Sequence, residues 1–327
     1  MRLVRSIFGL FLLASASWAA NPLRIYFVDV EGGQATLLVA PNGQTMLIDT
    51  GFDSFGGRDA VRIEKAMKDA DKKKLDYLVI THFHPDHAGG VKNIVGLFPV
   101  GTFIDHGTPV DTNKYSDDYA AAIAKSKHQV VTPGDKIKMK DLTVTIAAAA
   151  GKDRPGTGTP NRWCEGLTPR GGATGEDPQS VGLLIELGKF RFFDPGDLPY
   201  DRLLGVLCPT NQIGKIDLYL PARHGAEGPK ATYDMAARVA VVNNAARKGG
   251  AAAGWKVLSE SRDIDDIWQL HYAVDAGGEG NSRDAVIANL VPSGDEDGKF
   301  LKVEALPDGS FTVTNTRNKY LKKYGAR

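Results

Sequence analysis

Residues 81–87 read Thr81-His82-Phe83-His84-Pro85-Asp86-His87 and directly follow the apolar segment 75–80, whose sequence is LDYLVI. Three histidines and one carboxylate fall within six residues of a chain that has 7 histidines in total. Neutral imidazole is the commonest protein ligand for zinc and similar ions, and carboxylate oxygens often complete such sites. The stretch therefore predicts a metal site at the end of a buried strand, a usual place for active-site loops. The alternative is a histidine-rich surface turn that binds metal adventitiously.

The spacing inside this stretch indicates how its side chains divide between ions. His82 and His84 are two residues apart at a strand end, so both can project to the same side. Asp86 and His87 lie in the following turn and can face a second ion. Gly89 and Gly90 then allow a close backbone approach at the entry to a helix.

Hydrophobic patterns on both sides of the cluster predict an α/β chain with two β-rich sets and intervening helices. Such a pattern favours an αββα sandwich, in which two mixed sheets pack face to face and helices cover the outside. Residues 151–179 are rich in Gly, Pro and Thr and predict a long loop, which is functional or mobile when it lacks structure. Strands are expected at 23–28, 36–39, 44–48, 75–80, 102–104, 129–131, 136–139, 142–147, 181–187, 190–193, 217–220, 255–258, 285–290, 300–304 and 310–314, and helices at 58–70, 89–97, 116–125, 233–248 and 264–272.

The first residues are typical of a secretory signal peptide. Arg2 and Arg5 precede an apolar run and then small residues, and Ala19 satisfies the small-residue rule for cleavage. We therefore expect a signal peptide at 1–19, one folded domain at 20–327, and a periplasmic or secreted protein; a buried helix or an uncut anchor is the alternative. No other stretch is apolar for long enough to cross a membrane.

Charge and cysteine content narrow the partners. Cleavage would reduce the basic residues from 40 to 38 against 39 acidic ones, changing the formal net charge from +1 to −1. A near-neutral chain has no strong global attraction for nucleic acid. Cys164 and Cys208 form either a disulfide, which export would permit, or two separate buried thiols. The sequence leaves the oligomeric state open.

The motif Thr81-His82-Phe83-His84-Pro85-Asp86-His87-Ala88-Gly89-Gly90 resembles the H-x-H-x-D-H signature of the metallo-β-lactamase superfamily. Further pieces follow in the order expected for that family: Ile48-Asp49-Thr50-Gly51, Pro195-Gly196-Asp197 and Arg223-His224-Gly225. The first hairpin, Val28-Asp29-Val30-Glu31-Gly32-Gly33-Gln34-Ala35, is most similar to the hydrolase domain of bacterial DNA-uptake competence channels. The resemblance extends from about Leu23 to Gly225.

The resemblance implies a role for each matched residue. His82 and His84 would hold the first ion; Asp86, His87 and His224 would hold the second, and Asp197 would bridge the two. Asp49 would orient the ligand loop, or simply form a turn, or do both.

One departure from the family concerns the third histidine that many members supply to the first ion. The corresponding region, residues 175–180, has no histidine. Glu176 or Asp177 could take its place as an oxygen ligand. His106, which follows a strand, either lines the site or is an ordinary loop histidine. We expect His128 and His271 to be structural or surface residues.

Two divalent ions are therefore expected, with zinc favoured and manganese the alternative if oxygen ligands dominate. The implied reaction is hydrolysis by a metal-activated water, with Asp86 or Asp197 handling the proton. The similarity to the competence-channel hydrolase domain favours phosphodiester or phosphate-bearing substrates. Loops at 52–57, 106–115 and 151–179 would select the substrate. The last of these loops carries Arg154, Arg162, Trp163 and Arg170. The alternatives are a lactonase or β-lactamase acting on cyclic esters or amides, and a non-catalytic module that binds metal or a partner. The segment 250–327 either completes the second sheet or forms a small appended lobe.

Overall fold

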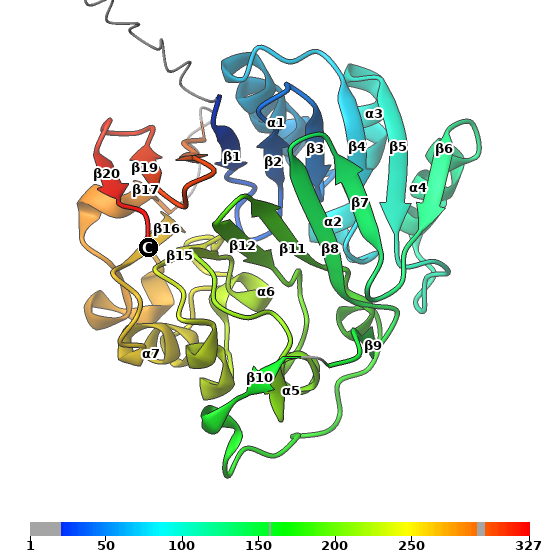
Figure 1. Ribbon diagram of the computed structural model, residues 1–327. Coiled ribbons are helices and arrows are strands. Elements are labelled where there is room, and N and C mark those ends of the chain that lie inside the picture. Colours follow the sequence, from blue (N-terminus) through cyan, green and yellow to red (C-terminus); the bar gives the residue numbers. More distant parts are fainter. Residues whose placement is uncertain (1–20, 157, 293–297) are drawn as a thin grey trace, which may run out of the picture.

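Two large mixed β-sheets packed face to face form the centre of the structure, a computed structural model that describes residues 21–156, 158–292 and 298–327 (Figure 1). The expected signal peptide lies outside the described residues. In the first sheet the strand order is β20-β19-β18-β1-β2-β3-β4-β5-β6. The strands are β1 (Leu23–Phe27), β2 (Thr36–Val39), β3 (Thr45–Ile48), β4 (Leu75–Val79), β5 (Val100–Asp105), β6 (Lys127–Val130), β18 (Leu301–Ala305), β19 (Phe311–Asn315) and β20 (Leu321–Tyr324).

The second sheet has the order β17-β16-β15-β14-β12-β11-β8-β7, with β9 paired to β8. Its strands from β12 to β17 are parallel, and those from β7 to β12 are antiparallel. The strands are β7 (Lys136–Met139), β8 (Leu142–Ala149), β9 (Lys152–Asp153), β11 (Gly182–Leu187), β12 (Phe190–Asp194), β14 (Leu218–Tyr219), β15 (Val239–Val242), β16 (Asp266–His271) and β17 (Ile287–Asn289), while β10 (Thr159–Pro160) and β13 (Thr210–Asn211) pair separately.

Helices cover the outer faces of the sandwich, as the αββα expectation requires. The first sheet is covered by α1, α3 and α4, and the second by α5 and α7 (Figure 1). The α-helices are α1 (Arg58–Asp69), α2 (Pro85–Ala88), α3 (Val91–Leu97), α4 (Lys114–Ile123), α5 (Tyr200–Leu207), α6 (Ala222–Gly225) and α7 (Ala252–Glu260). The 3₁₀ helices are η1 (Phe55–Gly57), η2 (Arg162–Cys164), η3 (Asp177–Gln179), η4 (Lys230–Met235), η5 (Val274–Ala276), η6 (Gly278–Gly280) and η7 (Asp284–Val286).

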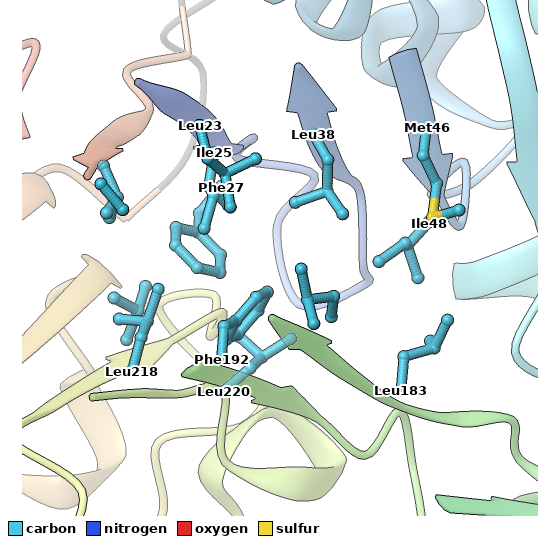
Figure 2. Packing of buried hydrophobic residues seen from close by; sticks show 14 of the residues in the cluster. Leu23, Ile25, Phe27, Leu38, Met46, Ile48, Leu183, Phe192, Leu218 and Leu220 are labelled. Atoms are coloured by element: carbon cyan, nitrogen blue, oxygen red, sulfur yellow. The ribbon is translucent and has the colours of Figure 1, made fainter. Parts of the chain in front are cut away.

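The main hydrophobic core lies between the two sheets. Ile25 and Phe27 of β1 point toward Phe192 of β12 and Leu218 of β14 (Figure 2). Tyr26, between them in the sequence, faces the opposite side and packs with the helices that cover the first sheet. Because successive strand side chains alternate between faces, and both faces are buried, these strands are apolar almost throughout. No helix in the described part of the chain is both long and apolar enough to span a bilayer.

Three expectations after residue 230 are wrong. The helix expected at 233–248 is instead η4 followed by the strand β15, and the helix expected at 264–272 is the strand β16. The strand expected at 255–258 lies inside helix α7. The segments β15 and β16 are short, apolar and buried on both faces, so they lack the alternation that separates strands from helices.

The segment after Gly250 is divided between the two sheets. Strands β16 and β17 form the parallel edge of the second sheet. The last three strands, β18 to β20, extend the first sheet through antiparallel pairing of β18 with β1. The segment thus contributes to both sheets rather than to the second alone.

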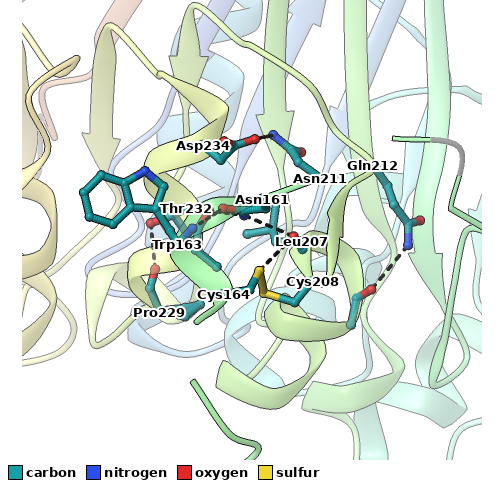
Figure 3. The surroundings of a disulfide bond; sticks show 12 residues. Asn161, Trp163, Cys164, Leu207, Cys208, Asn211, Gln212, Pro229, Thr232 and Asp234 are labelled. Carbon is teal, nitrogen blue, oxygen red and sulfur yellow. Dashed lines mark hydrogen bonds between the residues drawn. A yellow bond between two sulfur atoms is a disulfide. The ribbon is translucent and has the colours of Figure 1, made fainter. Parts of the chain in front are cut away.

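A disulfide between Cys164 and Cys208 ties the long loop to the end of α5 (Figure 3). Its half-cystines are 44 residues apart, and closing a loop of that length stabilises a protein by about 4 kcal/mol in the chain-entropy view. Asn161 reinforces the attachment by donating to the carbonyls of Leu207 and Ala231 at 3.1 and 2.9 Å. The loop is therefore fastened to the second sheet's helical layer well before it reaches Asp177.

Candidate metal centre

The predicted residues converge where parallel strands of both sheets end. In the first sheet, β3 and β4 run parallel, so Asp49 and Thr81 emerge at the same edge. In the second sheet, β12 and β14 are also parallel, and Asp197 and His224 follow them. The backbone N–H of Arg223 donates to the Gly196 carbonyl at 3.4 Å, which keeps these two segments together. Carboxyl ends of parallel strands are the usual location of ligand sites in α/β proteins.

His82, His84 and Asp177 form the first group of potential metal ligands. Nδ1 of His84 lies 2.9 Å from Oδ1 of Asp177, and Nε2 of His82 lies 3.5 Å from the same oxygen. The two imidazole nitrogens are 3.0 Å apart. Asp177, one of the two carboxylates that the sequence left open, thus completes the first group.

Asp86, His87, Asp197 and His224 form the second group, and all four are buried. Nε2 of His87 lies 3.5 Å from Oδ2 of Asp86 and 3.5 Å from Oδ1 of Asp197. Nε2 of His224 lies 3.2 Å from Oδ2 of Asp86 and 3.4 Å from Oδ2 of Asp197. The two groups adjoin, because the rings of His82 and His87 are 4.1 Å apart between centroids.

The chemistry of these atoms fits divalent cations. Nε2 of His87, Nε2 of His224 and Oδ1 of Asp197 are buried and have no hydrogen-bond partner among the described residues, and the same holds for Oδ1 of Asp177. Burying unpaired polar atoms is costly, and native proteins rarely leave several together. Cations held by these nitrogens and oxygens would satisfy all four, and the mixed donor set suits zinc or manganese.

Glu176 points away from its neighbour Asp177. Its carboxylate accepts from the backbone N–H of Phe83 at 3.0 Å and of Asp111 at 3.2 Å, and its Oε2 lies 3.0 Å from Nε2 of His106. His106 is therefore a bonded loop histidine that is not part of either group. Because Phe83 lies between His82 and His84, Glu176 and His106 support the ligand loop from behind.

Asp49 directly follows β3 and contacts His87, one of the candidate ligands. It adopts a left-handed conformation with φ of 62°, and its carboxylate accepts from N and Oγ1 of Thr81, both at 2.7 Å. Its Oδ2 also lies 2.6 Å from Nδ1 of His87. When the ring is neutral, this contact would keep its proton on Nδ1, so that Nε2 could bind a metal ion in the second group.

The turn at 28–35 braces the site from the opposite side. The Gln34 N–H donates to the Asp86 carbonyl at 3.0 Å, and Gln34 Nε2 donates to Oδ2 of Asp194 at 2.8 Å. A Cβ at Gly33 would come within 2.3 Å of the Asp86 carbonyl oxygen, so only glycine permits this approach. His271 and Asp29 anchor the turn further through a 2.8 Å contact, which gives His271 the structural role expected of it.

His224 lies in a strained segment. Arg223 and His224 have φ values of 52° and 57°, in the left-handed region that costs non-glycine residues about 1 kcal/mol or more each. The His224 carbonyl accepts from the Gly250 N–H at 2.7 Å, which helps to hold this conformation. Strain of this kind is concentrated at functional sites, where surrounding contacts maintain it.

Two positively charged side chains contact these groups, and the sequence analysis did not identify either of them. Nε of Arg223 lies 3.2 Å from Oδ2 of Asp177. Nζ of Lys248 donates to Oδ2 of Asp86. Arg223 belongs to the motif Arg223-His224-Gly225, but the sequence analysis assigned it no role. Lys248 is the last residue of the helix that was wrongly predicted at 233–248. Two residues that we expected in substrate-selecting loops, Arg162 and Trp163, instead line a pocket that contains none of the candidate ligands.

Burial and neighbouring charges shift the ionisation of the ligands. Burial lowers the pKa of His82 well below its ordinary value, so this ring is neutral. Burial also acts against protonated His87, but the carboxylates of Asp197, Asp86 and Asp49 prevail and raise its pKa well above the ordinary value. Burial opposes ionisation of Asp86, yet His87 and His224 hold its pKa far below the usual range. Without metal, the carboxylates of the second group therefore favour protonation of its two histidines.

Part of the chain matches the sequence model of a known protein family. The sequence model of the metallo-beta-lactamase superfamily matches residues 28–160, which include Asp49 and the cluster at 82–87. No curated protein matches the chain. Similar solved structures include the metallo-β-lactamase fold protein YhfI from Bacillus subtilis, at 13% identity and TM-score 0.41 over 68% of this chain and 85% of that one. A metallo-β-lactamase with a HARLDQ motif from Cronobacter sakazakii is 15% identical, with a TM-score of 0.39 over 64% of this chain and 80% of that one. The flavodiiron protein from Giardia intestinalis is 16% identical, with a TM-score of 0.32 over 53% of this chain and 37% of that one.

The fold and the two ligand groups define an αββα sandwich with a candidate centre for divalent metal ions at the edge where both sheets end. Residues 28–160 match the model of the metallo-β-lactamase superfamily, and this segment carries the histidine cluster.

Asp177 gives a direct test of the first group. Replacing it (Asp177→Ala) should weaken metal binding at one position by about a hundredfold or more, since even supporting residues behind a ligand contribute about 10- to 100-fold. Isothermal titration with zinc would measure the change. Asp275→Ala, which removes an exposed carboxylate paired with Arg247, is the matched control and should bind metal normally. Unchanged affinity in Asp177→Ala would show that another group completes the site.

Asp49 can be compared with a buried carboxylate elsewhere. Asp105 also lies 2.6 Å from a histidine ring, but that ring, His128, belongs to neither ligand group. Asp49→Asn should weaken the second metal position about 10- to 100-fold because His87 loses its orienting acceptor. Asp105→Asn should leave metal affinity unchanged in the same titration. Equal effects of the two substitutions would mean that Asp49 only stabilises the fold.

Metal binding to the second group should also release protons. The pKa values of His87 and His224 are raised in the metal-free protein, and a ligating histidine must be neutral. Metal affinity should therefore fall as the pH decreases, because His87 and His224 then take up protons that the metal ion must displace. Titration near pH 7 in buffers of different ionisation enthalpy would count the released protons. His224→Ala should release fewer, and a buffer-independent enthalpy for the unaltered chain would contradict the assignment.

Proposed function

We propose that this chain is an exported metal-dependent hydrolase that acts on phosphodiester or phosphate-bearing substrates. The observation that carries the proposal is the pair of adjoining ligand groups, one partly buried and one buried, each contacted by a half-exposed, positively charged side chain. The Arg223 side chain is 41% exposed beside the first group, and the Lys248 side chain is 46% exposed beside the second. Half-exposed cations next to a metal centre favour an anionic substrate, and guanidinium groups recognise phosphate well.

The proposed ligands are those that the structure brings together. His82, His84 and Asp177 would hold one ion; Asp86, His87 and His224 would hold the other, with Asp197 between them. Two divalent ions would supply Lewis acidity and a hydrolytic water that ionises near neutral pH. Zinc is the expected metal, and Asp177 in place of a histidine raises the oxygen content that would favour manganese.

The proton in this reaction would be handled by Asp86 or Asp197. Both carboxylates face the second group, and nearby histidines hold the pKa of each far below its ordinary value. Each is therefore ionised, so it can accept a hydrogen bond from the attacking water and orient it. Arg223 would meanwhile keep Asp177 in place and present its exposed side to the substrate.

Export is supported by two independent features. The arginines and the apolar run before residue 20 are typical of a secretory signal. Both cysteines of the chain are joined in the disulfide, which is the expected state in an oxidising compartment such as the periplasm.

The substrate class can be tested with three chromogenic or acyl probes. Metal-loaded protein should hydrolyse bis-p-nitrophenyl phosphate, and chelation should abolish that activity. His84→Ala should lower it at least a hundredfold because the first group loses a ligand, whereas His128→Ala, whose ring pairs with Asp105, should retain it. Activity only on nitrocefin and an acyl lactone would replace the phosphate assignment with hydrolysis of cyclic amides or esters. Bound metal with no turnover of any probe would indicate a non-catalytic binding module.

A further inference from the structure

Lys248 contacts the second ligand group at the atom that a metal ion would need. Its Nζ donates to Oδ2 of Asp86. That oxygen is also 3.2 Å from Nε2 of His224 and 3.5 Å from Nε2 of His87, so it faces the centre of the group. The ammonium group therefore shares its acceptor with any ion bound there.

The backbone around Lys248 positions its side chain to contact Asp86. The Ala245 N–H donates to the Lys248 carbonyl at 2.8 Å, closing a tight loop. Gly250, two residues further on, donates to the carbonyl of the candidate ligand His224 at 2.7 Å. On the other side, Lys248 Cβ would lie 2.9 Å from a Cβ added at Gly32, so the loop packs closely on the turn at 28–35. The loop that holds His224 thus also directs Lys248 toward Asp86.

Arg223 provides a contrast at the first group. Its Nε approaches Oδ2 of Asp177, whereas the histidines of that group approach Oδ1. Arg223 therefore orients the carboxylate from behind and leaves the inward oxygen free for metal. Lys248 instead contacts the same inward oxygen of Asp86 that the histidines approach. Two cations on one oxygen repel each other strongly in a partly buried site.

We propose that Lys248 is an internal competitor for the second metal position. The first group then loads before the second, and the second ion binds more weakly because it must displace the ammonium from Oδ2 of Asp86. Because the Lys248 ammonium competes with the second ion, both metal positions are filled only at higher metal concentration. The inference rests on the metal centre of the proposed function, but it does not depend on hydrolysis or on the identity of the substrate.

The test is metal titration of the whole chain without substrate. Lys248→Met removes the ammonium group, whose Nζ also lies 5.2 Å from the centroid of the Phe52 ring, and keeps most of the aliphatic stem. By isothermal titration with zinc, the unaltered chain should show two affinities at least tenfold apart. Lys248→Met should strengthen the weaker one at least tenfold and leave the stronger one within twofold. Lys256→Met is the matched control: that lysine side chain is 75% exposed on α7, and its removal should change neither affinity.

Three results would overturn the proposal. Equal affinities of the unaltered chain for both ions would show that the ammonium does not compete. Unchanged affinities in Lys248→Met would show the same, and weaker binding would make Lys248 a residue that only positions Asp86. Circular dichroism and thermal unfolding would establish that the variant is folded, and Lys248→Gln supplies a second neutral side chain that should behave like Lys248→Met. Because affinity is measured without turnover, failure of the phosphodiester assay would leave this result standing.

Discussion

The contact between Asp49 and His87 is the interaction on which the centre depends. Parallel pairing of β3 and β4 brings the two strand ends to one edge, and the Asp49 carboxylate then receives Thr81 and the His87 ring together. Without that acceptor, either nitrogen of His87 could carry the proton. With it, Nε2 faces the other ligands, and the short helix α2 that contains Asp86 and His87 is held in register with the strand before it.

The same edge explains why distant segments can share one site. Strands of the second sheet end beside strands of the first, so Asp197 and His224 meet a loop that lies more than a hundred residues earlier in the sequence. The turn at 28–35 connects the two halves through Gln34, which contacts both Asp86 and Asp194. Burial of Asp194 raises its pKa to about 7, so this carboxyl group is only partly ionised beside the charged ligands. The two sheets therefore support a single polar centre from opposite sides.

The two cations give this centre an asymmetric charge pattern. The carboxylate of Asp177 meets a guanidinium on its outer oxygen, and that of Asp86 meets an ammonium on its inner oxygen. Carboxylates and protonated histidines otherwise balance each other within the second group. A fold shared by many proteins does not by itself set metal affinity or substrate choice, so in the proposed function these few charged atoms would set both.

The sequence by itself determined the αββα class and the histidine cluster, because contiguous ligands and strand-end motifs are local signals. The order of motifs also identified Asp197 and His224 correctly as residues that reach the cluster. The choice between Glu176 and Asp177 could not be made from the sequence, since neighbouring carboxylates have the same chemistry and only the path of the chain turns one of them inward. The strands β15 and β16 and the contact made by Lys248 could not be predicted from the sequence either. Segments buried on both faces have no diagnostic period, and a lysine's partner is settled by packing between elements far apart in the chain.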